Sequence, residues 1–187
     1  MAEGPLPGPT AWRAVARCFV RTLVMLGRRQ IRWPRGNVGR TVGFSDGTTG
    51  RVYRETVVAG AAPSAPCFLV VSFRLRGVRG RGHALFRLES ILNTPLFAGF
   101  PGFVSKLWLA HDCHGVYRGL YEWDGAEDAE RYARSLWRVL ELVSARGSIA
   151  YRVVPGVRRD DVLADQGVLD RDSRTEEEAW WRVVAAT

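Results

Sequence analysis

The sequence predicts an α+β fold of the ferredoxin-like type, in which two helices cover one face of a four-stranded antiparallel sheet. Between residues 67 and 154, runs typical of strands and runs with helical spacing follow one another in the order βαββαβ. The chain has 187 residues, of which 47% are hydrophobic, so it can bury one sizeable core and still carry extensions at its ends. We therefore expect a main domain at residues 67–157, an N-terminal arm at residues 1–66 and an acidic tail at residues 158–187.

The arm begins with a basic amphipathic helix, expected at residues 11–29. Apolar side chains recur there at helical spacing, and Arg13, Arg17 and Arg21 form a stripe four residues apart. We expect the apolar stripe to pack on the body of the protein, a hypothesis favoured over docking to a membrane surface or to a partner helix. The apolar stripe consists of Trp12, Val15, Phe19, Leu23 and Leu26.

A β-hairpin is predicted after this helix. Residues 41–45 and 48–58 flank Asp46 and Gly47, a pair typical of tight hairpin turns. Residues 59–66 are small and interrupted by proline, which indicates a linker between the arm and the main domain.

The main domain is expected to contain four strands and two helices, with a loop rich in glycine and arginine before the first helix. The second helix has one apolar face and ends near Gly147, a residue typical of a C-cap. Its apolar face consists of Ala129, Tyr132, Ala133, Leu136, Leu140 and Val143. The strands are expected at residues 67–75, 103–110, 116–123 and 149–154, and the helices at residues 83–92 and 126–145.

Neither face of the predicted sheet is polar. In the second strand of the domain, Phe103, Leu107 and Leu109 are expected on one face, and Val104 and Trp108 on the other. Because the two helices can cover only one face, we infer that a second protomer covers the other and that the protein is a homodimer.

Charge and cysteine content limit the function classes. The net charge of +8 is uneven, because residues 1–58 carry ten arginines and three carboxylates, whereas residues 158–187 carry five arginines and eight carboxylates. The basic surface therefore belongs to the arm, and no recognised nucleic-acid-binding motif accompanies it. Cys18, Cys67 and Cys113 are odd in number and widely spaced, which indicates free thiols. No signal-peptide pattern or long apolar run is present, so we expect a cytoplasmic protein.

Lys106 is the residue that most strongly indicates chemistry. It is the only lysine among 27 basic residues, and it lies in an aromatic hairpin. Lys106 and Trp108 are expected on one face of a strand, with Tyr121 on the adjoining strand. A desolvated Lys106 would act as a base, or as an ammonium that holds an enolate oxygen, and Tyr121 would donate to the same oxygen. The competing interpretation is aromatic packing around a lysine that extends its ammonium to solvent.

His83 and Arg74 are further candidates. His83, at the start of the first helix of the main domain, would meet a substrate oxygen or simply cap the helix. Arg74, on the first strand, would bind a substrate carboxylate or form a salt bridge at a dimer interface.

Metal and nucleotide sites are not expected. His111, Asp112, Cys113 and His114 offer four ligands in a row, but successive side chains in a tight turn point apart, and no second cluster has metal spacing. No haem attachment motif is present, although ligation of haem by a single histidine stays open. The glycines of residues 76–82 fit neither of the common phosphate-binding patterns.

Several of these residues together resemble a known family. They are Pro101 to Phe103 (PGF), Lys106, Trp108, residues 119–121 (GLY), Ala129 and Tyr132. The pattern is similar to the dimeric α+β barrel superfamily, and in particular to its small mono-oxygenase branch, which is related to the antibiotic-biosynthesis mono-oxygenases. The resemblance covers residues 68–154. The arm and the tail lie outside it, and Trp180 and Trp181 are expected to tether the otherwise disordered tail by packing.

The resemblance implies a homodimer with a pocket in each protomer, between sheet and helices, for a hydrophobic aromatic or polyketide-like molecule. It also implies a mono-oxygenase of natural-product metabolism that needs no metal, flavin or haem, with a non-redox cyclase or isomerase as the alternative. A different alternative is a non-enzymatic interaction protein with a membrane- or partner-binding helix. The catalytic residues expected in the pocket are Lys106, Tyr121 and His83. The substrate-binding residues expected there are Trp108, Arg74, Trp123, Phe86 and Tyr132.

Overall fold

A computed structural model describes residues 4–78, 80, 82, 90–172 and 180–187. Within these residues the chain is an α+β protein, with three α-helices and an eight-stranded antiparallel sheet that curls into a half-barrel. The helical elements are α1 (Gly8–Gly27), α3 (Ala126–Val143), α4 (Arg159–Ala164) and the 3-10 helices η1 (Ser90–Leu96) and η2 (Gln166–Asp172). The strands are β1 (Ile31–Arg32), β2 (Thr41–Phe44), β3 (Thr49–Val58), β4 (Pro66–Arg74), β5 (Phe103–Leu109), β6 (Val116–Asp124), β7 (Ala150–Pro155) and β8 (Val183–Ala186).

The sheet combines strands from before, within and after the predicted main domain. Its strand order is β7-β4-β6-β5-β3-β2-β8, and β1 pairs with β3 beside this path. The two predicted hairpins, β2 with β3 and β5 with β6, are confirmed, and so are the strands β4 and β7. The loop at residues 59–65 connects β3 to β4, and β3 itself pairs with β5, so the segment before the loop continues the same sheet.

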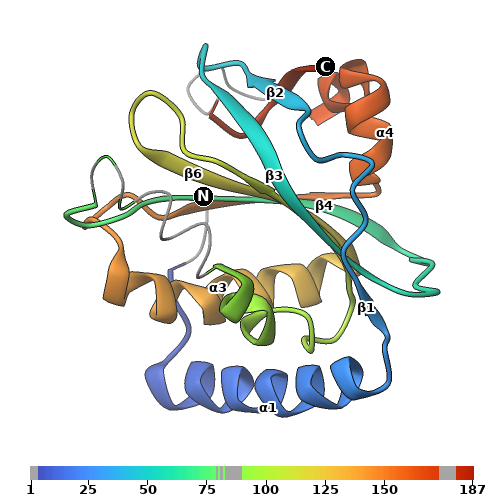
Figure 1. Cartoon of the computed structure of the whole chain (residues 1–187), viewed down its shortest axis with the longest axis vertical. Coiled ribbons are helices and arrows are strands. Elements are labelled where there is room, and N and C mark those ends of the chain that lie inside the picture. Colours follow the sequence, from blue (N-terminus) through green and yellow to red (C-terminus); the bar gives the residue numbers. More distant parts are fainter. Residues whose placement is uncertain (1–3, 79, 81, 83–89, 173–179) are drawn as a thin grey trace.

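The sheet is buried on both faces, as the strand sequences predict. Successive residues of β4 alternate between two cores: Leu69 and Val71 belong to the first, and Phe68 and Val70 to the second. Figure 1 shows α3 and then α1 on one side of the sheet, and α4 on the other. The first core lies between the sheet and α3, with η1 and α1 packed around it.

The C-terminal segment covers the second face, which corrects the argument for a second protomer there. Val162, Leu163, Leu169, Trp181 and Val183 are all buried in the second core. The tail forms α4, η2 and β8, and its predicted packing is confirmed at both tryptophans, since Trp181 is buried in the second core and Trp180 is partly buried against it. The expectation failed because a charge-rich tail gave no sign of the few apolar residues that fit this face. A homodimer stays a prediction, without support from this face.

A β-bulge corrects the predicted faces of β5. The pairing with β6 shifts between Phe103 and Ser105, so two residues of β5 oppose one of β6. Phe103 consequently joins Trp108 in the first core, while Leu107 and Leu109 lie in the second. Strict alternation from Phe103 had predicted the opposite face for this residue, because an inserted residue reverses the alternation beyond it.

The predicted helix at the N-terminus is confirmed as α1, but only Val15 and Leu26 of the predicted apolar stripe pack against the body of the protein. Its buried residues are Ala11, Val15, Cys18 and Thr22. The reason is the close approach of α1 to Gly99, where a Cβ atom would lie 2.3 Å from the backbone oxygen of Cys18. Such a short separation admits only small side chains between the two segments, so the large apolar residues of the predicted stripe, such as Trp12, Phe19 and Leu23, remain exposed.

The two helices predicted in the main domain have different outcomes. The second is α3, and its predicted apolar face is buried apart from Val143, which is exposed. The helix α3 ends at Val143, two residues before the predicted end at residue 145. It ends there because Ser144 pairs with Leu75 and the Arg76 N–H bonds to the Val143 oxygen. Most of the predicted first helix lies outside the described residues, and its last residues belong to η1. None of the described helices is long and apolar enough to cross a membrane.

Replacing Trp181 by alanine is expected to lower the free energy of unfolding by about 3–5 kcal/mol, because it empties part of the second core. Urea denaturation followed by circular dichroism measures the change. Val184→Ala is the control, because Val184 lies on β8 but is 49% exposed, and its effect should stay within about 0.5 kcal/mol. Equal stability of the two variants would show that the tail does not cover this face in solution.

Candidate functional site

A cavity of about 570 Å³ lies between the sheet and α3. Its walls are largely aromatic, with contributions from the strands, from η1 and its following turn, and from α3. The aromatic lining residues are Tyr53, Phe73, Phe97, Trp108, Tyr121 and Tyr132, with Tyr117 at the end near the β5–β6 turn. The charged lining residues that the structure describes are Arg76, Lys106 and Arg118, and no carboxylate is among them.

Lys106 faces this cavity from the middle of β5. It pairs with Tyr121 across the β5–β6 ladder and shares its face with Trp108, which confirms the predicted arrangement. Its Nζ atom lies 3.2 Å from the centre of the Trp108 ring, 4.5 Å from that of Phe97 and 4.8 Å from that of Tyr121. Lys106 is only 7% exposed, so the interpretation in which its ammonium reaches solvent does not fit.

The surroundings of Lys106 favour its neutral amine. Among the described residues, the aromatic rings of Trp108, Phe97 and Tyr121 surround its Nζ atom. Burial lowers the pKa of Lys106 well below its usual value, and the positive charge of Arg54 lowers it further. Aromatic faces attract a cation, but they do not replace the hydrogen bonds that water gives to an ammonium. The site therefore favours the neutral, proton-accepting form of the amine more than water does.

Two tyrosines supply hydrogen-bond donors beside the amine. The Tyr132 hydroxyl donates to the Tyr121 hydroxyl at 3.1 Å, and both side chains are fully buried. Burial raises the pKa of Tyr121 and that of Tyr132, so both stay protonated phenols. Since Tyr121 accepts a bond from Tyr132, its own hydrogen remains to be donated to a substrate oxygen. Gly119 makes room for this arrangement, because a Cβ atom there would lie 2.7 Å from the Tyr121 ring.

The structure does not bring every predicted residue to the cavity. Trp123 is buried behind its wall, where its ring centre lies 4.8 Å from that of Tyr132. Arg74 is exposed at the end of β4 and does not line the cavity, which corrects its predicted role in binding substrate. Arg76, two residues further on, lines the cavity instead, and its guanidinium donates to the Ser144 backbone oxygen. His83 and Phe86, the remaining candidates, lie outside the described residues.

Sequence reasoning missed Tyr53 and Phe97 on the cavity wall. Tyr53 lies on β3, which was predicted as a strand, but nothing in the sequence indicated that β3 pairs with β5 beside Trp108. The rings of Tyr53 and Trp108 are 6.3 Å apart as a result. Phe97 follows η1, and the centres of the Phe97 and Trp108 rings are 5.2 Å apart. The density of aromatic residues near Lys106 was the one available signal, and it did not identify these two.

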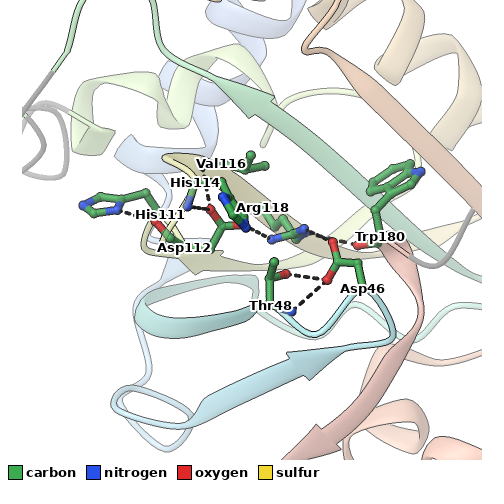
Figure 2. Close-up of polar contacts among 8 residues, drawn as sticks. All are labelled: Asp46, Thr48, His111, Asp112, His114, Val116, Arg118 and Trp180. Atoms are coloured by element: carbon green, nitrogen blue, oxygen red, sulfur yellow. Dashed lines mark hydrogen bonds and ion pairs between the residues drawn. The ribbon is translucent and has the colours of Figure 1, made fainter.

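The turn with four potential metal ligands has a structural role. Figure 2 shows Asp112 turned toward the backbone of its own turn, where its Oδ1 accepts the N–H groups of His114 and Val116. Its other oxygen bonds to Arg118 at 2.7 Å. Cys113 is exposed, and all three cysteines are free, as predicted. No group of three or more potential metal ligands occurs among the described residues.

Arg118 connects this turn to two other segments. Its guanidinium bonds to Asp112 and, at 2.7 Å, to Asp46 in the β2–β3 turn, and its Nε donates to the Trp180 backbone oxygen. Figure 2 shows Arg118 between these three partners. The same side chain reaches the cavity wall, so the ion pairs also fix one end of the cavity.

Comparisons with protein families, with curated proteins and with solved structures found no match to this chain. The chemistry of the site therefore rests on its own residues. They provide an apolar cavity, an amine with a lowered pKa and a phenol that can donate a hydrogen bond. This combination can remove a proton from an acidic O–H or C–H group and hold the resulting oxyanion.

Lys106→Met is expected to stabilise the protein by about 1–3 kcal/mol at neutral pH, because it removes an amine that loses its hydration on folding. Between the lowered pKa of Lys106 in the folded protein and its usual value of 10.5, the unfolded chain binds one proton more. Wild-type stability should therefore rise with pH in this interval relative to the variant. Urea denaturation across this pH range measures the difference. An unchanged or lower stability of Lys106→Met at neutral pH would contradict the assignment.

Asp112→Asn is expected to lower the free energy of unfolding by about 2 kcal/mol at neutral pH, because it weakens charged hydrogen bonds in a buried turn. Burial alone would raise the pKa of Asp112, but hydrogen bonds from Val116, Arg118 and His114 and the Arg118 charge hold it below its usual range. The stabilisation is thus present above the usual carboxyl pKa and is lost as the pH falls through the folded pKa. Denaturation at neutral and acidic pH tests this.

The control is Asp128→Asn, which removes a surface ion pair to Arg131. Its effect should be below about 1 kcal/mol at every pH. If the two variants behave alike, the buried turn does not depend on its carboxylate.

Proposed function

We propose that the protein is an enzyme that acts on a hydrophobic aromatic or polyketide-like molecule, as a mono-oxygenase that uses its substrate's own anion to reduce dioxygen. The observation that carries this proposal is the position of Lys106. The only lysine of the chain is buried, faces an aromatic cavity and lies beside a phenol that can donate a hydrogen bond. A lysine amine that is buried among aromatic rings costs stability, which is typical of a residue retained for chemistry.

The finer part of the fold belongs to this proposal. We infer that β4, β5, β6 and β7 with α3 form a ferredoxin-like unit of the dimeric α+β barrel type. The order β7-β4-β6-β5, the antiparallel pairing and the position of α3 over one face support this. The added strands β3, β2 and β8 extend the β5 edge, and the C-terminal segment occupies the face that a second sheet would cover. The cavity lies on the helix side and needs no second protomer for the walls that are described.

The walls limit the class of substrate. A volume of about 570 Å³ is in the range of pockets that bind drug-sized molecules, and flat aromatic walls suit planar rings. Among the described lining residues, Arg76 is a cation and Lys106 becomes one when it takes a proton, and no carboxylate is present, which favours a substrate that develops negative charge. Arg118 is neutralised by its ion pairs with Asp46 and Asp112. A polycyclic phenol or an enolisable aromatic ketone meets both conditions.

Lys106 is the base in the proposed mechanism. Its neutral Nζ takes a proton from the substrate and becomes an ammonium, which the faces of Trp108, Phe97 and Tyr121 stabilise. The electron pair of the broken bond stays on the substrate as an enolate or phenolate. Tyr121, polarised by Tyr132, donates a hydrogen bond to the oxygen that bears this charge.

The anion then supplies electrons to dioxygen. A ring CH₂ group becomes a carbonyl, one oxygen atom enters the product and the other leaves as water, so that R₂CH₂ and O₂ give R₂C=O and H₂O. Exclusion of water by the apolar walls protects the intermediate. A cyclase or isomerase would use the same proton transfer without consuming dioxygen.

Lys106→Met is expected to lower kcat/KM by about 10²–10⁴-fold, the usual contribution of a positioned base. Native mass spectrometry of the freshly purified protein would identify a bound aromatic metabolite, and oxygen uptake with that compound or with polycyclic phenols and anthrones measures turnover. Arg74→Gln is the control, since Arg74 is exposed and does not line the cavity.

The outcomes separate the candidate functions. Turnover without oxygen uptake would indicate that the protein is a cyclase or isomerase and not a mono-oxygenase. If Lys106→Met retains turnover, Lys106 is not the base in either reaction. An empty cavity and no turnover with any of these compounds would leave the proposal without support.

A further inference from the structure

We propose that α1 docks the protein on an anionic lipid bilayer through the apolar face that it turns away from the body. This outer apolar face consists of Trp12, Phe19, Val20, Leu23 and Val24, each between 45% and 63% exposed. Five large apolar side chains on one helix are more than scattered surface residues and indicate a binding surface. The inference concerns association only and does not depend on the proposed reaction.

The arrangement around the helix axis fits a bilayer surface. At about 100° per residue, Phe19, Trp12, Leu23 and Val20 follow one another within about 100° beside the buried face. Arg13, Arg17 and Arg21 occupy the next part of the circumference, with Val24 between the first two, and Arg28 follows the end of the helix. All four arginines are exposed. Interfacial helices have this pattern, in which aromatic and aliphatic residues enter the boundary of the acyl chains while arginines meet the headgroups.

The positive charge around α1 favours a bilayer over a second copy of the chain or a nucleic acid as its partner. Residues 8–35 contain seven arginines and no carboxylate. Two copies of the chain that associated through α1 would bring these positive charges together, whereas anionic headgroups neutralise them. A nucleic acid would satisfy the arginines but would leave the outer apolar face in water.

The helix is held in place before any partner binds. Cys18 donates its thiol hydrogen to the Pro95 backbone oxygen at 3.2 Å, and the fully buried Thr22 lies beside Gly99. Before the helix, the Leu6 N–H bonds to the Arg134 oxygen of α3. Figure 1 shows α1 as the outermost layer on its side of the sheet. A preformed helix docks without the entropic cost of folding on the membrane.

The test is flotation of the full-length protein with vesicles of phosphatidylcholine alone or mixed with phosphatidylglycerol, at low and high salt. Binding is expected only to the anionic vesicles, and it should weaken with salt. Arg17→Gln with Arg21→Gln should weaken binding about thirtyfold, since each arginine near the surface contributes roughly 1 kcal/mol. Phe19→Ser with Leu23→Ser should weaken it about tenfold or more, because less apolar surface enters the bilayer.

Matched controls are Arg146→Gln and Val184→Ser, which change an exposed arginine and an exposed valine outside α1. Both should bind as the wild type does, and circular dichroism with thermal melting confirms that every variant is folded. Three results would overturn the proposal. They are no binding of the wild type to anionic vesicles at low salt, loss with the arginine variant but not the apolar variant, and a homodimer that the apolar variant converts to monomers.

Discussion

One chain buries both faces of the strands β4, β6 and β5, and the rest of the structure depends on this constraint. The hydrophobic runs of these strands need cover on each side, and the helix α3 can supply only one. The curl of β2 and β8 and the segment from α4 to η2 supply the other. The chain itself fills the second face, whereas the cavity lies on the first face, between the sheet and α3.

Buried charged side chains have different partners on the two faces of the sheet. On the second face, Arg118 bonds to Asp112 and Asp46, and Arg159 bonds to Glu55 at 2.7 Å. The Arg118 and Arg159 guanidiniums thus have carboxylate partners, which repay part of their lost hydration. Lys106, on the cavity side, has aromatic rings in place of a carboxylate among the described residues. The ion pairs of Arg118 and Arg159 therefore lie with the second core, whereas the Lys106 amine faces the cavity.

The segment from Pro95 to Phe100 connects the cavity with α1. It lies against α1 at Cys18 and Gly99, and Phe97 within it forms part of the cavity wall beside Lys106. A bilayer bound to the outer face of α1 would therefore be one helix away from this wall. Aromatic and polyketide-like compounds partition into membranes, so the proposed docking and the proposed substrate class are physically compatible, although each rests on its own observations.

The sequence by itself determined the elements whose signals are local. Periodicity predicted α1, α3 and the two hairpins, and the rule that residues two apart share a strand face predicted that Lys106, Trp108 and Tyr121 meet. Tertiary structure alone decided the faces of α1 and of Phe103, the pairing of β3 with β5 and the cover that Trp181 gives to the second face. These features depend on close approach at Gly99, on an inserted residue and on contacts between distant segments. Local patterns carry no information about such contacts, because they depend on the volumes and registers of parts of the chain that meet only after folding.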